Sequence, residues 1–201
     1  KIKDYFYYNN KNYLVLNLYD KNLTQIKYEK YNSINYIILI NNIFKIILKT
    51  LEDIHNHGYI HRDIKPSNIC LDKMNEPYLI DFGFSKKYIT NNKHIEEKKI
   101  KSIIGSYSFI SNNVNKLIEP TRRDDIESLI YIYIYMLIDK DYEKDIFKIK
   151  NDSFTYIKSI LLSFNINDKL TNNIIEMLYY IRLLKFNQTP NYSYLLNILL
   201  S

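Results

Sequence analysis

The sequence has few of the residues that break secondary structure or crosslink a chain. Its 201 residues include 3 glycines, 4 prolines and 1 cysteine, and neither tryptophan nor alanine occurs. A single cysteine, Cys70, excludes an intrachain disulfide and suits a reducing compartment such as the cytoplasm or nucleus. No run of about twenty apolar residues and no secretory leader pattern is found. The sequence therefore predicts a soluble protein with no membrane partner.

Hydrophobic residues make up 46% of the chain, enough to bury one sizeable core in a single folded unit. The formal net charge is +6, from 28 basic and 22 acidic residues. Such a surplus would favour acidic partners or anionic surfaces. Spread along a whole chain, however, it more often reflects a solvated surface. We expect no nucleic-acid partner, and the sequence does not indicate an oligomeric state.

One stretch puts an acid, a base and an amide within a short loop. It reads His61-Arg62-Asp63-Ile64-Lys65-Pro66-Ser67-Asn68. Downstream, Ile69 to Leu71 and Pro77 to Ile80 are predicted strands around a polar turn, and the second ends at Asp81-Phe82-Gly83. Either block alone would be read as an ordinary loop or turn. Together they fit the catalytic loop and the metal-binding motif of protein kinases.

The resemblance implies a role for each of these residues. Asp63 would accept the proton of the attacking hydroxyl, and Lys65 would place a positive charge on the phosphoryl group in flight. Asn68 and Asp81 would hold Mg²⁺, with ATP as the phosphoryl donor. In serine/threonine kinases a hydroxyl after the activation-segment glycine bonds to the catalytic Asp and Lys, and Ser106 keeps it. Gly83 would let the backbone turn where a side chain would clash.

Three further stretches narrow the resemblance to casein kinase I, with the vaccinia-related kinases as a near neighbour. They are Asp81-Phe82-Gly83-Phe84-Ser85-Lys86-Lys87-Tyr88, Gly105-Ser106-Tyr107-Ser108-Phe109-Ile110-Ser111-Asn112 and Thr121-Arg122-Arg123-Asp124-Asp125-Ile126-Glu127-Ser128-Leu129. The family implies that Asp125 caps a central helix and bonds to the catalytic loop's backbone. It also has an arginine where this chain has Ser108, so recognition of primed substrates is not carried over.

The resemblance predicts an α+β protein kinase-like fold, with a mainly helical large lobe and the last hairpin of the small lobe. Residues 1–20 would be the end of the small lobe and the hinge, and residues 21–201 the large lobe. Asp4 to Tyr8 and Tyr13 to Leu18 read as strands joined by a polar turn. Asn17, Leu18 and Tyr19 would then offer backbone groups to adenine, with Leu16 lining the pocket. Without the downstream motifs, an ordinary hairpin would be preferred.

Apolar residues recur at helical spacing between Tyr36 and His57, which predicts an amphipathic core helix. Helices are also predicted over residues 156–164 and 172–184. Residues 130–135 alternate Ile and Tyr, a pattern typical of a strand, but the motif context favours a buried helix over residues 125–138. His55 and His57 indicate structural or surface roles rather than a metal site.

The chain begins at Lys1 and lacks a glycine-rich loop, a strand lysine for the nucleotide phosphates and its partner glutamate. We expect either a fragment of a longer kinase, which the missing initiator Met favours, or a natural remnant. The resulting hypothesis is a serine/threonine kinase acting on protein substrates. Its lysine-rich segment, residues 84–102, would attract acidic substrates or simply form a solvated loop. The alternative is a weak or inactive pseudokinase that serves as a binding module.

Overall fold

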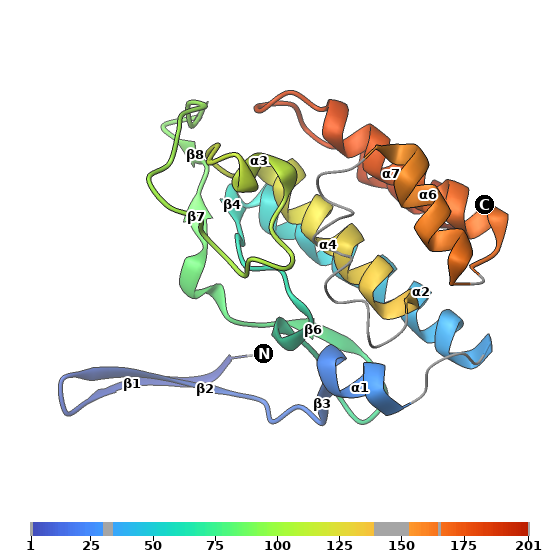
Figure 1. The fold of residues 1–201 in the computed structure, drawn as a ribbon. Helices are drawn as coiled ribbons and strands as arrows, with labels where there is room; N and C mark the ends of the chain where they lie inside the picture. The colour runs from blue at the N-terminus through green and yellow to red at the C-terminus, as the bar shows by residue number, and fades with distance from the viewer. Residues whose placement is uncertain (1, 30–33, 139–152, 165, 201) are drawn as a thin grey trace.

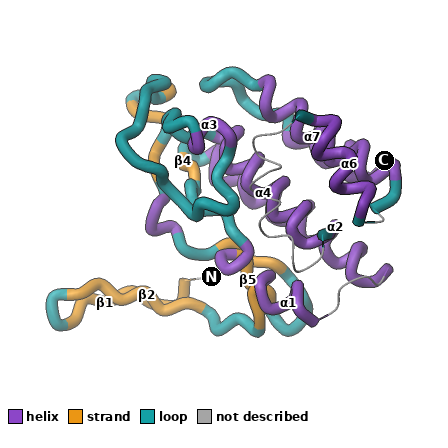
Figure 2. The backbone as a smooth tube through the Cα atoms, in the orientation of Figure 1, coloured by secondary structure: helices purple, strands orange, loops and turns teal. Residues whose placement is uncertain are grey.

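The computed structural model describes residues 2–29, 34–138, 153–164 and 166–200 (Figure 1). Helices form the body of the molecule, and short strand pairs and loops lie along one side of it (Figure 2). No helix among the described residues is long and apolar enough to cross a bilayer.

The chain opens with a two-stranded antiparallel hairpin, β1 (Ile2–Tyr8) and β2 (Lys11–Leu16). Asn9 and Asn10 both have positive φ, 47° and 58°. Two consecutive left-handed residues give a turn whose twist matches the strands it joins, and asparagine tolerates that conformation. The hairpin extends from the body as an arm (Figure 1), and every residue of both strands is exposed. The second strand ends at Leu16, two residues earlier than predicted.

Two helices form the centre of the body, α2 (Ile34–Asn56) and α4 (Arg122–Leu137). The apolar face predicted for the first helix is buried in the core: Ile40, Ile43, Phe44, Ile47, Leu48 and Leu51 are each at most 3% exposed. The helix ends before Gly58, whose φ of +82° is easily adopted only without a side chain. The chain then turns back toward the loop that starts at His61.

Helix α4 is buried along its whole length, including its polar residues. Glu127 accepts a hydrogen bond from the Tyr131 hydroxyl (2.6 Å) and one from Arg182 Nε (3.0 Å). Its charge is thus paired inside the body. The helix predicted over residues 125–138 is confirmed, although it begins three residues earlier. The alternating Ile and Tyr residues do not form a strand, because neighbours surround this segment on every side.

Short strands join the loops to the helical body. Strands β3, β5 and β6 form one sheet in that order, β4 pairs with β7, and β8 pairs with β9, all antiparallel. Their bounds are Lys21–Asn22, Ile69–Leu71, Pro77–Leu79, Tyr59–Ile60, Lys86–Lys87, Ile89–Thr90 and Lys93–His94, respectively. The lysine-rich segment therefore contains paired strands and is not only a solvated loop.

The remaining helices complete the body around this centre. Helices α6 and α7 overlap the regions predicted as helical but start earlier, and α8 packs against both α2 and α7. The bounds are α1 Leu23–Glu29, α3 Asn112–Asn115, α6 Phe154–Ser163, α7 Asp168–Leu183 and α8 Tyr192–Leu200, with 3-10 turns η1 Pro66–Asn68 and η2 Phe82–Phe84.

Candidate active site

The loop that starts at His61 is held in place by a buried carboxylate on α4. Asp125 accepts hydrogen bonds from the backbone N–H groups of His61 (2.7 Å) and Arg62 (2.8 Å). Arg62 adopts a left-handed φ of 69°, which costs on the order of 1 kcal/mol for a residue with a side chain. Two charge-assisted bonds on adjacent amides stabilise this sharp bend. The predicted contact between Asp125 and the loop backbone is confirmed.

The family resemblance implied that Asp125 caps helix α4, but the structure shows that it does not. The helix begins at Arg122, and Asp124 is the carboxylate that reaches back to the Thr121 N–H (2.8 Å). An acid at the third position of a helix commonly satisfies the N-cap amide in this way. Asp125 lies one position further along, so its side chain is turned toward the loop instead.

A buried histidine supports Asp125 from behind. His55 Nε2 lies 3.0 Å from Asp125 Oδ2, and its Nδ1 lies 2.5 Å from the hydroxyl of Tyr192 on α8. Burial would raise the pKa of Asp125, but the hydrogen bonds and charges of His55 and His61 together outweigh burial and lower it. Asp125 therefore stays ionised as an acceptor. The structural role expected for His55 is confirmed. The contact with Tyr192 was not predicted, since no sequence pattern links residues so far apart.

Asp63 is at the centre of a compact cluster of polar side chains and is only 2% exposed. Lys65 Nζ lies 2.7 Å from its Oδ2. Ser106 donates to Oδ1 from both its hydroxyl (2.8 Å) and its backbone N–H (3.0 Å). The Asn68 amide donates to the carboxylate (3.2 Å) and to the backbone oxygen of Asp63 (3.0 Å). The structure thus brings Asp63, Lys65, Asn68 and Ser106 together.

These partners control the charge on Asp63. Burial alone would raise its pKa, but the hydrogen bonds from Lys65 and Ser106 outweigh burial and hold the pKa below the usual value. The carboxylate is therefore ionised at neutral pH. Its lone pairs can orient a hydroxyl group presented from the open side of the cluster.

Gly105 lets Ser106 approach the loop. Its φ is +94°, and a Cβ at this position would lie 2.4 Å from the backbone oxygen of Arg62. Any other residue would clash with main-chain atoms that cannot move aside. The glycine is thus required by a close approach of two backbone segments, at the point where the hydroxyl of Ser106 meets Asp63.

The Asp81-Phe82-Gly83 turn lies beside the same cluster. Ile80, the preceding residue, donates its N–H to the Asn68 backbone oxygen (2.9 Å) and accepts from His61 Nε2 at 3.1 Å. The Phe82 ring meets the His61 ring edge-on, with centroids 4.9 Å apart. Asp81 is exposed, has a left-handed φ of 63°, and accepts the Gly83 N–H (3.2 Å). The positive φ is therefore at Asp81 and not at Gly83. A Cβ on Gly83 would meet the Asp81 carboxylate at 3.1 Å.

The residues expected to hold Mg²⁺ fit a hard cation by their chemistry. Asp81 offers a carboxylate at the surface, and Asn68 offers an amide oxygen directed away from Asp63, because its nitrogen donates to that carboxylate. Carboxylate and amide oxygens are the protein ligands that Mg²⁺ prefers, with water or phosphate oxygens completing the shell. In the described part of the chain, the Asp81 side chain makes no hydrogen bond to Asp63 or Asn68.

Of the four residues expected at the adenine ring, Leu16 is the last residue of the arm, and the other three lie between the arm and the body. The Tyr19 ring contacts the Tyr78 ring in a tilted arrangement, with centroids 4.9 Å apart, and Asp20 donates its N–H to the Leu71 backbone oxygen (2.9 Å), so the chain joins the body here. Leu18 is 99% exposed and Leu16 38%. The Asn17 side-chain oxygen is buried without a hydrogen-bond partner. In the described part of the chain, the Asn17 side chain makes no hydrogen bond to the Asp63 cluster.

Two contacts between the lysine-rich segment and the body could not be predicted from the sequence. Lys86 forms an ion pair with the buried Glu119 (2.6 Å), and Arg62 Nε donates to the Phe84 backbone oxygen (2.6 Å). These contacts attach the lysine-rich segment to the body. They join residues more than twenty positions apart, so they could not be inferred from local spacing. Lys86 is therefore paired with Glu119, and in this it differs from the exposed lysines that follow it.

Comparisons with known proteins identify the family of this chain. Residues 1–193 match the family model described as the protein kinase domain. A probable casein kinase I homolog of Encephalitozoon cuniculi is 34% identical over 162 residues, which cover 77% of this chain and 51% of that protein. The chain thus spans about half the length of the curated relative that it matches. The predicted α+β kinase-like fold and the resemblance to casein kinase I are both confirmed, and the chain belongs to the protein kinase family.

Proposed function

We propose that this chain carries the catalytic lobe of a serine/threonine protein kinase of casein kinase I type, which transfers the γ-phosphate of ATP to protein hydroxyls. The observation that carries the proposal is the Asp63 carboxylate, buried, ionised and bonded to Lys65, Asn68 and Ser106. Family membership and the casein kinase I relative support it.

Phosphoryl transfer requires positioning and charge neutralisation more than covalent chemistry. Asp63 would orient the substrate hydroxyl and take its proton. Lys65 Nζ, 2.7 Å from that carboxylate, would stabilise negative charge on the transferred group. The Ser106 hydroxyl and N–H hold the Asp63 carboxylate in one orientation, which limits the entropy lost when a substrate docks.

Asn68 and Asp81 would hold Mg²⁺, which when bound neutralises charge on the ATP phosphates. The backbone bond between Ile80 and Asn68 (2.9 Å) keeps the two segments adjacent. The strained left-handed conformation of Asp81 fixes where its carboxylate emerges.

We assign residues 1–20 to the end of the small lobe and the hinge, and residues 21–201 to the large lobe. The exposed arm supports this division, since a hairpin with two open faces is only marginally stable unless other structure covers it. Leu16, Asn17, Leu18 and Tyr19 would then contact adenine. A reducing compartment is in keeping with the free thiol of Cys70.

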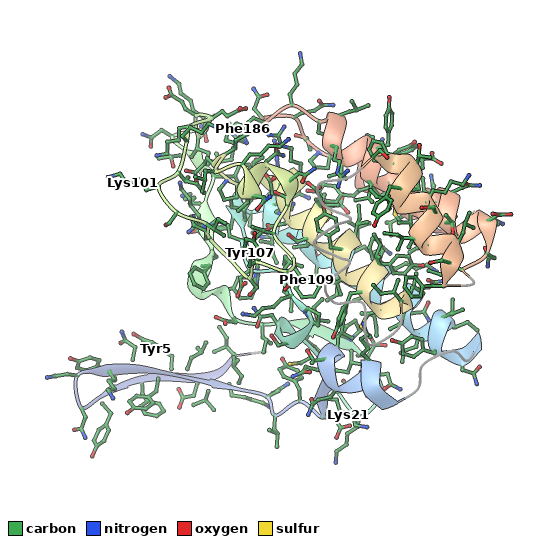
Figure 3. The ribbon with its side chains drawn as sticks, viewed as in Figure 1. Tyr5, Lys21, Lys101, Tyr107, Phe109 and Phe186 are labelled. Carbon is green, nitrogen blue, oxygen red and sulfur yellow. The ribbon has the colours of Figure 1, made fainter. Side chains whose placement is uncertain are left out.

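The substrate would be a protein with acidic residues at some distance from its acceptor hydroxyl. The exposed lysines that support this proposal lie after the ion-paired Lys86: Lys87, Lys93, Lys98, Lys99 and Lys101. Lys101 is on the outer loop of this segment (Figure 3). Exposed charges of one sign attract a partner from a distance and do so less at high salt.

The test is transfer of radioactive phosphate from MgATP to serine, threonine and tyrosine peptides, with wild-type chain and Asp63→Asn. We expect the variant to lose about 10²- to 10⁴-fold in rate while its circular dichroism is unchanged. Asp53→Asn is the matched control, because Asp53 is an exposed aspartate on α2. Wild-type activity in Asp63→Asn would refute the assignment. A wild-type chain that transfers no phosphate and that MgATP does not stabilise thermally would favour the binding-module alternative.

A further inference from the structure

A pocket of about 360 Å³ opens between the C-terminal end of α2, the strands β7 and β8 and the first turn of α4. Figure 1 shows β7 and β8 next to each other on one side of the helical body. Asp63 does not line this pocket, and neither do its partners Lys65, Asn68 and Ser106. The pocket is therefore separate from the candidate active site.

The charged side chains that line the pocket are all basic. Lys87 is exposed, Arg122 is 8% exposed, and His57 adds a ring that can also carry a positive charge. No aspartate or glutamate belongs to the lining, all of which is in the described part of the chain. A larger pocket, by contrast, has Glu96 and Glu97 among its lining residues. The charge at the first pocket therefore favours an anion.

The guanidinium group of Arg122 has only neutral partners in the described part of the chain. Its Nη1 donates to the Thr189 hydroxyl (3.0 Å) and to the Tyr88 hydroxyl (3.3 Å), and its Nη2 donates to the Asn187 backbone oxygen (2.7 Å). The Nε atom is buried without a hydrogen-bond partner. A buried cation without a carboxylate next to it is costly, so an anion in the pocket would offset a charge that the protein itself leaves unpaired.

Backbone contacts hold the walls of the pocket in place. Tyr88 donates its N–H to the Gly58 backbone oxygen (2.8 Å) and its hydroxyl to the His55 backbone oxygen (2.6 Å). Gly58 in turn donates its N–H to the His55 backbone oxygen (2.9 Å), and Lys87 pairs with Tyr59 between β7 and β4. A site that is already formed loses little conformational entropy when a ligand binds.

Neutral donors complete the lining. Asn91 and Asn92 form the turn between β8 and β9, with φ values of 51° and 59°, and the Thr189 hydroxyl lies on the side of Arg122. Amide and hydroxyl groups can donate hydrogen bonds to oxygen atoms from directions that the two cations do not cover. A phosphate group has three or four oxygens arranged as a tetrahedron, so it can use donors on several sides at once. The pocket therefore suits phosphate better than a planar carboxylate.

We propose that this pocket binds a phosphate group, carried either by free phosphate or by a phosphorylated side chain of a peptide. The site is distinct from the Asp63 cluster. The inference is independent of the proposed phosphoryl transfer, because none of its residues takes part in that step.

The three glycines of the chain allow the site of binding to be located by NMR. Gly58 lines the pocket, whereas Gly83 and Gly105 lie at the candidate active site. Each glycine follows a different residue type, so carbonyl labelling of the preceding residue assigns its amide signal. Inorganic phosphate, added without magnesium or nucleotide, should shift the Gly58 signal in a saturable way, whereas sodium chloride at equal ionic strength should not. Shifts confined to Gly83 and Gly105, or no shift at all, would overturn the inference.

Charge-removing variants tie the affinity to the pocket. Lys87→Gln should weaken phosphate binding about tenfold, because a charge-assisted hydrogen bond is lost. Lys93→Gln is the matched control, since Lys93 is also exposed but lies on β9 outside the pocket. Equal losses in both variants would show that only net charge attracts the anion, and an unchanged affinity in Lys87→Gln would also refute the site. Arg122→Gln should abolish binding, and if that variant does not fold, Lys87→Gln decides the question.

A phosphoserine peptide distinguishes the two sources of the phosphate group. Its affinity is compared with that of inorganic phosphate and of the same peptide with unmodified serine, each followed by the Gly58 signal. Tighter binding of the phosphopeptide than of inorganic phosphate would identify a phosphorylated protein as the ligand, and equal or weaker binding would identify free phosphate. If the unmodified peptide bound as tightly as the phosphopeptide, the pocket would not recognise phosphate and the inference would fail.

Discussion

The arm and helix α4 are built from similar residues in opposite environments. Residues 5–8 read Tyr-Phe-Tyr-Tyr and residues 130–135 alternate Ile and Tyr. In the arm, every strand residue is exposed, and the strands bond only to each other among the described residues. In α4, every residue is buried. Similar aromatic and β-branched residues thus form exposed strands in the arm and a buried helix in α4, so the surroundings and not residue preference alone decide the conformation.

Of the substitutions that test this comparison, the one at Tyr133 is expected to have the largest effect on the free energy of unfolding. It is 1% exposed, its ring lies 4.9 Å from that of Phe44, and its hydroxyl donates to the Asn41 side chain. Tyr133→Ala should lower the free energy of unfolding by about 3–5 kcal/mol, because it leaves a cavity and an unpaired amide oxygen. Urea denaturation measures the change.

Tyr133→Phe serves as the control for packing, since it removes the hydroxyl alone and should cost about 1 kcal/mol. If Tyr133→Ala cost no more than Tyr133→Phe, α4 would not be as tightly surrounded as its burial indicates.

The contrast between the arm and the buried helix α4 also explains which parts of the fold could be predicted from the sequence. The hairpin and α2 follow from local rules, because asparagine turns and one-sided apolar spacing leave a readable pattern. Helix α4 has no polar face, so no periodicity marks it, and only the neighbouring motifs indicated a helix. Asp63, Lys65 and Asn68 could be proposed because they lie within six residues. The hydrogen bonds from His55 to Asp125 and to Tyr192 bring together distant segments, and only the folded chain shows them.

A second prediction concerns Asp124, at the start of α4. Its carboxylate is 3% exposed and accepts hydrogen bonds from the Ser111 hydroxyl (2.5 Å) and the Thr121 N–H (2.8 Å). Burial raises its pKa from 3.8 to about 6, although those two bonds and the charge of Arg123 act to lower it. Between these two pH values the folded chain holds a proton that the unfolded chain has released.

Stability should therefore fall as the pH rises from about 4 to about 6, by at most about 3 kcal/mol from this group. Asp124→Asn cannot titrate, so its unfolding free energy, measured across this range, should fall less than that of the wild type. Asp4→Asn in the exposed arm is the control and should leave the profile unchanged. Identical profiles for Asp124→Asn and wild type would show that Asp124 is already ionised throughout the range.

The smallest effect is expected in the arm, at Tyr8. This residue is 62% exposed and pairs across the hairpin with Lys11. Tyr8→Ala should change the free energy of unfolding by less than about 0.5 kcal/mol, because the substitution removes little buried surface. Urea denaturation under the conditions used for Tyr133→Ala makes the two tyrosines directly comparable. If Tyr8→Ala lowered the free energy of unfolding as much as Tyr133→Ala, the contrast between the exposed arm and the buried helix α4 would be wrong. It would mean that other structure covers the arm in solution, since a tyrosine open to water on both faces cannot contribute several kcal/mol to folding.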